Sequence, residues 1–401
     1  MSDDLSFYSI LEQYPDEASA ERYFIAHRWP NGVRCTRCQS ANVLRGTQPG
    51  RNRQLWICHG CDKRFSVTSG TVMQDTKLPL RKWLLAFQFM GASKKGIRAL
   101  QLSRMLKLTY KSAWHLCHRI RETMKNDAQV FTGIVETDET YIGGRRTGRG
   151  RGYIGNKATV TTIIRRNSEG ENDSQAQSTA YSYESVDGRT VGPNLRKHTI
   201  PSETVLMTDT SPIYSRVGES FSDHHTVNHK AKEYVREDMD GHLATTNTAE
   251  GFFANLKRQT GGTHHSVSKK HLQRYLEEHD FKFNNRQVSD GARTAKAVSS
   301  IEGRRLTLHK SPSGGPSLFD GKIGERRRKP KRPVKKTKST KDAPAARAAP
   351  MTTPAPRRTA AAQVPANPVP APVVPRTPAP PTSIMWGREL PRVPPKKPAG
   401  K

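Results

Sequence analysis

The sequence predicts a multidomain α/β protein that carries a small cysteine module near its N-terminal end. Two Cys-x₂-Cys pairs lie within residues 35–61, and strand-like runs alternate with helix-like segments over residues 131–290. After residue 324 the composition changes abruptly to basic, then Pro/Ala-rich, sequence. At 401 residues the chain is long enough for two or three domains with cores of their own. The alternation of strands and helices indicates a mixed α/β domain.

The expected elements follow from hydrophobic spacing and from turn residues. Residues 16–28 read as a short helix that the following Trp-Pro-Asn-Gly ends, and residues 79–125 read as helices. Strands are expected at 134–138, 158–165, 178–184 and 204–208, and helices near 190–197 and 248–258.

The four cysteines of the module have the spacing of a zinc ribbon. Cys35 and Cys38 form the first pair, and Cys58 and Cys61 form the second, with 19 residues between the two pairs. Four thiolates complete a tetrahedral zinc site that is closed to water, so this Zn²⁺ is expected to be structural. The alternatives are two unligated pairs, or a ligand role for His59, for which a solvated side chain is the simpler explanation. Cys117 lies in an apolar helical pattern and is expected in the core.

Residues 97–121 read as two helices with a short turn between them. The second segment, residues 110–121, begins with hydroxyl and basic side chains. This order is typical of a helix-turn-helix, whose second helix enters the major groove of DNA. That helix would present Lys111, Ser112 and His115 to the DNA. The alternative is an ordinary helical hairpin with a basic, solvated face.

The charge of the chain predicts a polyanionic partner. Lys and Arg number 67 against 36 acidic residues, a net charge of +31. Residues 326–401 carry 19 basic and two acidic residues, so the rest of the chain is basic in its own right. We found neither a secretory signal nor an apolar stretch of membrane-spanning length. A cytoplasmic protein that acts on nucleoid DNA is therefore expected.

Three acidic residues stand out in this basic chain. Asp138 and Asp209 each close an apolar or β-branched run, and Glu250 opens an amphipathic segment. Carboxylates repel phosphate, so a nucleic-acid-binding protein that keeps several of them usually does so to hold Mg²⁺ or Mn²⁺. The three residues therefore predict a catalytic metal site.

The amphipathic segment places a lysine in line with Glu250. A helix that begins near Thr248 has Asn247 at or near its cap and Glu250 in its first turn. Lys257 returns to nearly the same face about 10 Å further along the axis. This arrangement suits a metal ligand followed by a phosphate contact. Taken alone, however, the segment is better explained as a packed helix with a solvated acid and lysine.

Six stretches occur in collinear order over about residues 10–290. They are Trp29-Pro-Asn-Gly-x₂-Cys35-x₂-Cys38, Gly96-Ile-x₃-Gln101-Leu-x₃-Leu106-x-Leu-Thr-Tyr-Lys-Ser-Ala-Trp114, Val135-Glu-Thr-Asp-Glu-Thr-Tyr-Ile-Gly-Gly144, Val227-Asn-His-x₃-Tyr234, Thr246-Asn-Thr-x-Glu-Gly-Phe-Phe-x₂-Leu-Lys-Arg258, and His271-Leu-Gln-Arg-Tyr275 with Phe283-Asn-Asn-Arg286. Through them the chain resembles the zinc-ribbon DDE transposases of bacterial insertion sequences, the ISXO-like group.

This resemblance implies a ribonuclease-H-like catalytic core with a mixed sheet. Asp138 and Asp209 correspond to its two aspartates, Glu250 to its third acid and Lys257 to its trailing lysine. Some branches are described with asparagine as the third member, and Asn247 stands three residues before Glu250. We expect Glu250 to be the ligand, because a carboxylate binds Mg²⁺ better than an amide does.

The expected function is transposition of an insertion sequence by two-metal phosphoryl transfer, with end cleavage followed by strand transfer. Two Mg²⁺ or Mn²⁺ ions are held by the three acids, and Lys257 and Arg258 contact DNA. The ribbon and the helix-turn-helix bind the terminal inverted repeats, and synapsis of two ends implies a homodimer or a larger assembly. A DNA-binding regulator with an inactive core and a nuclease without strand transfer are the alternatives.

The expected organisation has five parts. They are an N-terminal helical segment (1–30), the zinc ribbon (31–70), the helix-turn-helix region (71–128), the DDE core (129–300) and a disordered basic Pro/Ala-rich tail (324–401). The tail has almost no large apolar residues with which to offset the entropy of ordering. It is expected to add only non-specific affinity for DNA.

Overall fold

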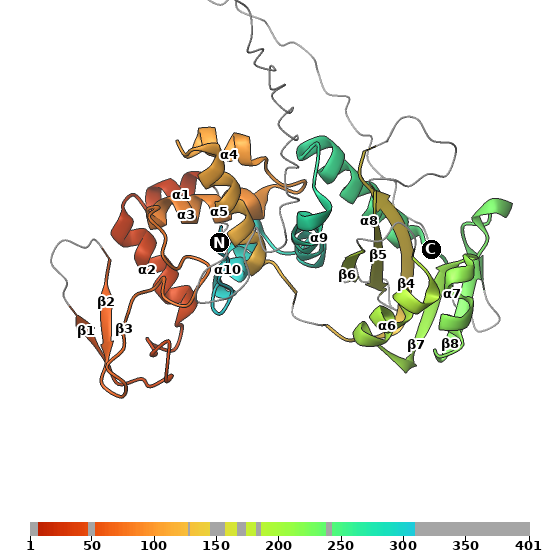
Figure 1. Ribbon diagram of the computed structural model, residues 1–401, viewed down its shortest axis with the longest axis horizontal. Helices are drawn as coiled ribbons and strands as arrows, with labels where there is room; N and C mark the ends of the chain where they lie inside the picture. The colour runs from red at the N-terminus through yellow and green to blue at the C-terminus, as the bar shows by residue number, and fades with distance from the viewer. Residues whose placement is uncertain are drawn as a thin grey trace, which may run out of the picture. The chain divides into compact units, whose positions relative to one another are not determined.

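The computed structural model describes residues 7–46, 53–126, 129–144, 157–166, 174–181, 186–237 and 243–308 (Figure 1). The expected tail, residues 324–401, lies outside the described residues. In the part of the chain that is described, no helix is both long enough and apolar enough to span a membrane.

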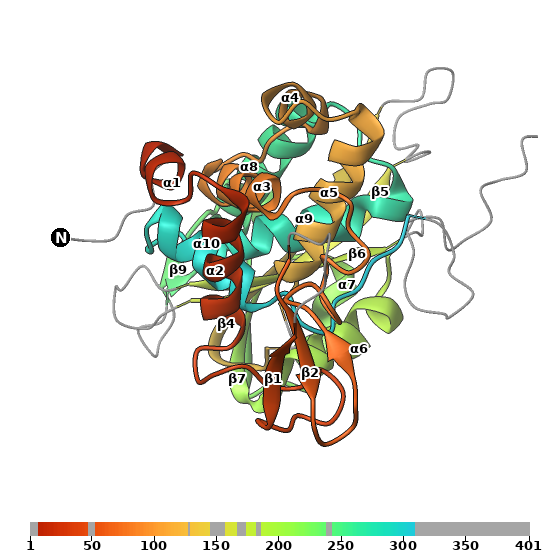
Figure 2. The ribbon, with the colours of Figure 1, turned by 90° about the vertical axis from the view of Figure 1, so that its left-hand side faces the viewer.

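The N-terminal part consists of two helices and a small antiparallel sheet. Helix α2 begins at Glu17 because the Asp16 side chain accepts the backbone N–H of Ser19 at 2.7 Å in a capping box. This confirms the helix that was expected over residues 16–28. The elements are α1 (Phe7–Gln13), α2 (Glu17–Arg28), β1 (Val43–Gly46), β2 (Leu55–Cys58) and β3 (Arg64–Phe65), with the strands in the order β1-β2-β3 (Figure 2).

The predicted helical region is confirmed as three helices, α3 (Leu80–Ala92), α4 (Ala99–Met105) and α5 (Tyr110–Thr123). Helix α5 begins after a turn because the Thr109 side chain accepts the backbone N–H of Ser112 at 3.2 Å. A further helix, α10 (Asp290–Ser299), packs closely against α3. A Cβ atom at Gly91 on α3 would lie 2.6 Å from Thr294 Oγ1 on α10, so only glycine allows this approach.

The predicted mixed sheet is confirmed and has five strands in the order β6-β5-β4-β7-β8. Strand β5 is antiparallel to both β4 and β6, whereas β4, β7 and β8 run parallel. The strands are β4 (Phe131–Ile142), β5 (Ala158–Arg165), β6 (Gln175–Tyr181), β7 (Thr199–Asp209) and β8 (Asp223–Val227). A separate two-stranded hairpin joins β9 (Arg236–Glu237) to β10 (Leu243–Ala244).

Helices cover both faces of this sheet, because apolar side chains alternate along its strands. On β5, Ile164 packs with α8 (Asn247–Lys257) and α9 (Lys269–Asn284), whereas Ile163 packs with α6 (Gly188–His198) and α7 (Pro212–Gly218). Figure 1 shows α8 and α9 on one side of the sheet and α6 and α7 near β7 and β8. The expectation of α6 and α8 is confirmed, whereas α7, α9 and β8 were not expected.

A buried ionic network joins helix α5 to helix α9. Arg121 Nε lies 2.7 Å from one carboxylate oxygen of Glu278, and Lys282 Nζ lies 2.5 Å from the other. The Arg121 guanidinium also lies 4.0 Å from the centre of the Tyr275 ring. Arg121, Glu278 and Lys282 are all buried, so the negative charge of Glu278 must balance the two positive charges in place of water.

Candidate active site

Asp138 and Asp209 lie side by side on neighbouring parallel strands. The register of β4 and β7 pairs Ile134 with Val205 and Glu136 with Met207. Continuing this register by two residues aligns Asp138 with Asp209 on one face of the sheet, the face covered by α8 and α9. The sheet therefore brings together two carboxylates that are 71 residues apart in the sequence.

The environment of Asp138 favours its neutral form. Burial, together with the negative charges of Glu139, Asp209 and Glu250, raises the pKa of this carboxyl to about 7. The backbone N–H of Glu139 acts in the opposite direction, because it donates to Asp138 Oδ1 at 2.7 Å. A bound cation would relieve this repulsion, which is the behaviour expected of a metal ligand.

Glu250 approaches the two aspartates from the first turn of helix α8. Its charge raises the pKa of Asp138, so the structure brings Glu250 into the same acidic cluster. Helix α8 is placed by Glu136, whose carboxylate accepts the Thr248 hydroxyl at 2.8 Å and the Ala249 backbone N–H at 2.9 Å. Glu136 is fully buried and pairs with Arg166 at 3.1 Å. It therefore holds the helix and has no free oxygen to offer a metal ion.

Asn247 is the first residue of α8 rather than its cap, which is Thr246. This is a shift of one residue from the expected position and lies within the usual uncertainty of helix ends. The backbone N–H of Asn247 donates to Thr245 Oγ1 at 3.1 Å. Asn247 and Glu250 thus share the first turn of the helix beside the aspartates.

His229 is a neighbour of Glu250 to which the sequence assigned no role. Its Nε2 atom lies 3.7 Å from a carboxylate oxygen of Glu250 and 2.9 Å from Thr246 Oγ1. The ring is in contact with Tyr234. The Val-Asn-His motif over residues 227–229 was visible in the sequence, but nothing in it indicated that the histidine would meet the start of α8.

Glu139 lies on the opposite face of β4, as expected for a residue next to Asp138 in a continuing strand. Its carboxylate accepts the hydroxyl of Tyr214, a fully buried residue of α7, at 2.6 Å. Burial raises the pKa of Glu139, and the charge of Asp209 raises it further. The hydrogen bond between Glu139 and Tyr214 therefore holds β4 against α7 next to Asp138.

Lys257 and Arg258 lie at the far end of α8, about 10 Å along the axis from Glu250. Lys257 is exposed and lines a cavity together with Tyr141, Gly143 and Gly144. Arg258 is exposed and donates to Asn255 Oδ1 at 3.3 Å. Both residues are therefore separated from Glu250 along the axis of α8 and lie at the end of the helix away from the carboxylates.

The acidic cluster offers only oxygen ligands, which suit Mg²⁺ or Mn²⁺. In the described part of the chain, the four cysteines are the only group of three or more potential ligands whose atoms lie within 4.8 Å of one another. The carboxylates are more widely spaced than the thiols. Because Glu250 is about half exposed on a helix, rotation of its side chain can shorten this spacing around an ion.

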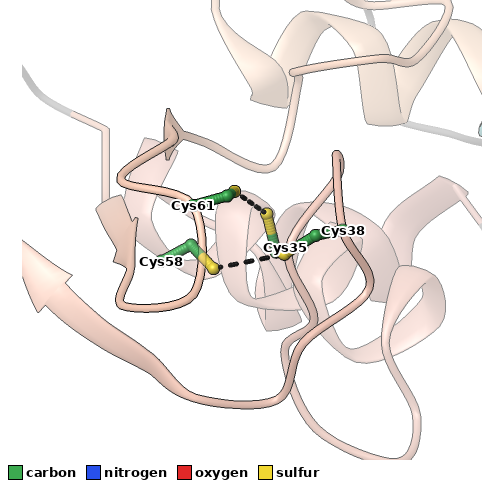
Figure 3. Close-up of side chains that lie close together, drawn as sticks. All are labelled: Cys35, Cys38, Cys58 and Cys61. Atoms are coloured by element: carbon green, nitrogen blue, oxygen red, sulfur yellow. Dashed lines mark hydrogen bonds between the residues drawn. The ribbon is translucent and has the colours of Figure 1, made fainter.

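The four thiols form a closed cluster that fits zinc (Figure 3). Cys35 Sγ lies 3.6 Å from Cys61 Sγ, and Cys38 Sγ lies 3.5 Å from Cys58 Sγ. A tetrahedron with zinc–sulfur bonds of about 2.3 Å has edges of about 3.8 Å, close to these values. His59 is exposed and Cys117 lies in the core, as expected.

The two cysteine pairs adopt the same backbone conformation. The residue after each pair, Gln39 or Asp62, has a positive φ of 60° or 54°. Each also donates its backbone N–H to the carbonyl oxygen of the first cysteine of its pair, at 3.0 Å for Cys35 and 2.9 Å for Cys58. Two equivalent knuckles therefore present four sulfur atoms to one point.

The start of α5 exposes only part of the predicted DNA-reading surface. Lys111 is exposed, whereas Ser112 and His115 are half-buried. The hydroxyl of Ser112 lies 2.9 Å from Thr109 Oγ1 in the cap of the helix. Lys111 is therefore the most accessible of the three predicted contacts.

Comparisons with known proteins agree with this geometry. Residues 130–284 match the family described as the ISXO2-like transposase domain, and residues 15–64 match the transposase zinc-ribbon domain. The chain is also 30% identical over 142 residues to a protein of Halobacterium salinarum described as an uncharacterized protein in transposable element ISH50. The matched stretch covers 35% of this chain and 47% of that protein, so the chain spans about half the length of this relative.

Proposed function

The chain belongs to the ISXO2-like transposases with a zinc ribbon, and on this premise we propose that it cuts and joins DNA at the ends of an insertion sequence. The observation that carries the proposal is the parallel register of β4 and β7, which when continued aligns Asp138 with Asp209, while Glu250 in the first turn of α8 adds its charge to theirs. The strand order and directions of the sheet support a ribonuclease-H-like core.

Three acids would hold the catalytic ions. Asp138, Asp209 and Glu250 would together hold two Mg²⁺ or Mn²⁺ ions. When bound, such ions neutralise charge on the phosphoryl oxygens and make the attacking oxygen more nucleophilic. A carboxylate binds Mg²⁺ better than an amide does, which favours Glu250 over Asn247 as the third ligand.

The reaction consists of two phosphoryl transfers. In the first, a water oxygen bonds to the scissile phosphorus, and the bond from phosphorus to the 3′-oxygen breaks to leave a 3′-hydroxyl. In the second, that hydroxyl attacks a phosphorus of the target strand and displaces a new 3′-oxygen. The protein contributes mainly the positions of the reacting groups, which the sheet and the start of α8 hold rigidly.

The N-terminal parts would select the DNA. We assign the zinc ribbon, about residues 31–70, and the helix-turn-helix region, about 71–128, to binding of the terminal inverted repeats. Lys111 is the exposed contact on α5, and Lys257 and Arg258 would hold phosphates near the cut. Two ends must meet before joining, so a homodimer or a larger assembly is part of the proposal.

The test is an in vitro reaction with duplexes that carry the inverted repeats flanking this gene, in Mg²⁺ or Mn²⁺. Asp138→Asn and Asp209→Asn should abolish cleavage and strand transfer while end binding stays within a few-fold of wild type. Cleavage without joined products would indicate a nuclease, and end binding without cleavage would indicate a regulator. Activity of Glu250→Gln together with inactivity of Asn247→Ala would move the third ligand to Asn247.

A further inference from the structure

A cavity of about 1080 Å³ lies beside the zinc ribbon. Its walls come mainly from the ribbon and from residues 66–79, which lead from the ribbon to α3. Leu55 and Pro79 supply the apolar side chains among the described lining residues, and most of the others are polar or charged. Pockets for small ligands are usually smaller and mostly apolar, so this wall better suits an extended polar ligand.

The two acidic residues in the wall are already engaged by other groups. Glu17 accepts the backbone N–H of Leu80 at 2.6 Å and that of Arg81 at 3.1 Å, at the start of α3. Asp75 pairs with Arg305 at 2.7 Å. A helix N-terminus and a guanidinium group therefore balance these two charges, and the five basic residues of the wall remain in excess.

Four of the five basic side chains are exposed and form no hydrogen bond or ion pair with the residues that the structure describes. They are Arg37, Lys63, Arg64 and Lys77. The fifth, Arg53, donates to the carbonyl oxygens of Thr76 at 3.3 Å and Leu78 at 2.8 Å, and so ties this segment to the ribbon. Three separate stretches of chain thus bring four available positive charges to one cavity.

The register of the ribbon sheet places Arg64 on the side of the cavity. Strands β2 and β3 pair Ile57 with Arg64, and paired residues share a face of the sheet. Leu55 stands two residues from Ile57, so it lies on that same face, and it also lines the cavity. Arg45 on β1 pairs with Trp56 and lies on the opposite face, outside the cavity lining. The sheet therefore offers one exposed arginine at the cavity and a matched one away from it.

Arg37 is held by the first cysteine knuckle. It lies between Cys35 and Cys38 (Figure 3), and its backbone N–H donates to Cys35 Sγ at 3.4 Å. Its neighbour Thr36 also lines the cavity. The cysteine cluster therefore fixes one wall of the cavity as well as the fold of the ribbon.

We propose that this cavity binds the phosphate backbone of duplex DNA at the end of the insertion sequence. Exposed cations and hydroxyl groups are the usual contacts of phosphate oxygens. None of the described lining residues is aromatic, so they offer no ring on which an unpaired base would stack. The inference rests on the proposed function, because it takes end DNA as the ligand. It adds that this side of the ribbon grips the backbone and leaves the reading of bases to other surfaces.

The test measures affinity as a function of salt. Wild type and variants are titrated in Ca²⁺, so that the result does not depend on turnover, against an end duplex, a random duplex and a single strand. Arg64→Ala and Lys77→Ala should each reduce the slope of log K against log salt by about 0.9 on both duplexes, and the double variant by about 1.8. Between 1 M and 0.1 M salt, wild type should therefore gain about eightfold more affinity than each single variant.

Matched variants separate charge from structure. Arg37→Ala should reduce the slope as Arg64→Ala does, while it retains zinc. Arg64→Lys should keep the wild-type slope, because it keeps the charge. Arg45→Ala removes an equal charge from the other face of the same sheet and should leave the slope unchanged. Zinc content and the melting temperature confirm that each variant is folded.

An unchanged slope in the folded double variant would overturn the inference. A reduction confined to the end duplex, or to the single strand, would also overturn it, because a contact to the duplex backbone must act on both duplexes alike. Metal-dependent cleavage by a protein whose slopes do not change would reject the cavity and leave the proposed function intact. Slopes that fall as expected, in a protein that never cleaves, would support the cavity and reject the proposed function.

Discussion

Glu136 accepts the backbone N–H of Ala249 at 2.9 Å, and this bond ties the central strand of the sheet to the first turn of α8. Glu136 lies two residues before Asp138 on the same face of β4. The two acids nevertheless differ in function, because the oxygens of Glu136 are occupied by Thr248, Ala249 and Arg166. Strand β4 thus carries both Asp138, the proposed metal ligand, and Glu136, which holds the first turn of α8 in place.

Glu136→Gln is expected to weaken metal binding without removing a ligand. An amide keeps the shape of the side chain but loses the charge that pairs with Arg166 and faces the start of α8. The Mn²⁺ concentration for half-maximal cleavage should rise about 10- to 100-fold, the usual effect of removing support from a ligand. Glu237→Gln, at an exposed position on β9, should leave it unchanged. An unaltered Mn²⁺ dependence in Glu136→Gln would show that Glu136 does not position the site.

Glu278→Gln is expected to destabilise the fold strongly. It leaves Arg121 and Lys282 buried without a counter-charge, which costs about 3–5 kcal/mol. The free energy of unfolding is measured by urea titration. Asp75→Asn, which breaks an exposed ion pair with Arg305, should cost no more than about 1 kcal/mol. Similar losses in the two variants would contradict the importance of the buried network.

Asp280 is expected to make stability depend on pH. Burial raises the pKa of this carboxyl to about 8, although the side chain and backbone N–H of Ser178 donate to it. The folded state therefore binds more protons than the unfolded state, whose aspartate pKa is about 3.9. The contribution of Asp280 is fully present below pH about 4 and is lost as the pH rises to about 8.

Comparison with Asp280→Asn isolates this contribution. As the pH rises from 5 to 7, the free energy of unfolding of wild type should fall by at least about 1 kcal/mol relative to that of the variant. This is the change expected when the folded state holds about one more proton than the unfolded state. Other titrating groups largely cancel in this difference. A constant difference over that range would mean that Asp280 is ionised in the folded protein.

Cys58→Ser should abolish zinc binding and loosen the ribbon. The cluster then has three thiols, and structural zinc sites contribute directly to folding. Elemental analysis of purified wild type should give one zinc per chain, and the variant should have little or none. Cys117→Ser provides the control, because that buried thiol lies outside the cluster and should leave the zinc content unchanged. Zinc-free, folded wild type would disprove the structural role.

Local patterns were sufficient to predict the ribbon and to single out Asp138 and Asp209, although Asp138 lies within β4 rather than at its end. The Cys-x₂-Cys spacing defines two knuckles without reference to the rest of the chain, and Asp138 and Asp209 are marked by the apolar runs that they close. The parallel register that aligns them could not be predicted, because it depends on the pairing of β4 with β7. The sequence therefore supplied candidate residues for the site, whereas their relative positions come from the structure.

Helix α9 illustrates what the sequence hides. It buries Glu277, Glu278, Asp280 and Lys282, a run that reads as a solvated charged segment. Lys282 pairs with Glu278 on the same helix, but two of the acids also have remote partners: Arg121 is 157 residues from Glu278, and Ser178 is 102 residues from Asp280. Hydrophobic spacing cannot reveal a helix whose interior face is polar and paired through tertiary contacts.

The parallel register of β4 and β7 also determines which changes in chain length the protein can tolerate. Side chains alternate along a strand, so one inserted or deleted residue between Val205 and Asp209 would turn Asp209 from the face of α8 to the face of α7. Substitutions can accumulate on this strand one at a time, but a single-codon insertion or deletion there would move Asp209, a proposed metal ligand, to the other face of the sheet. Divergent descendants of this gene should therefore vary in length between the strands while the β7 segment keeps its residue count.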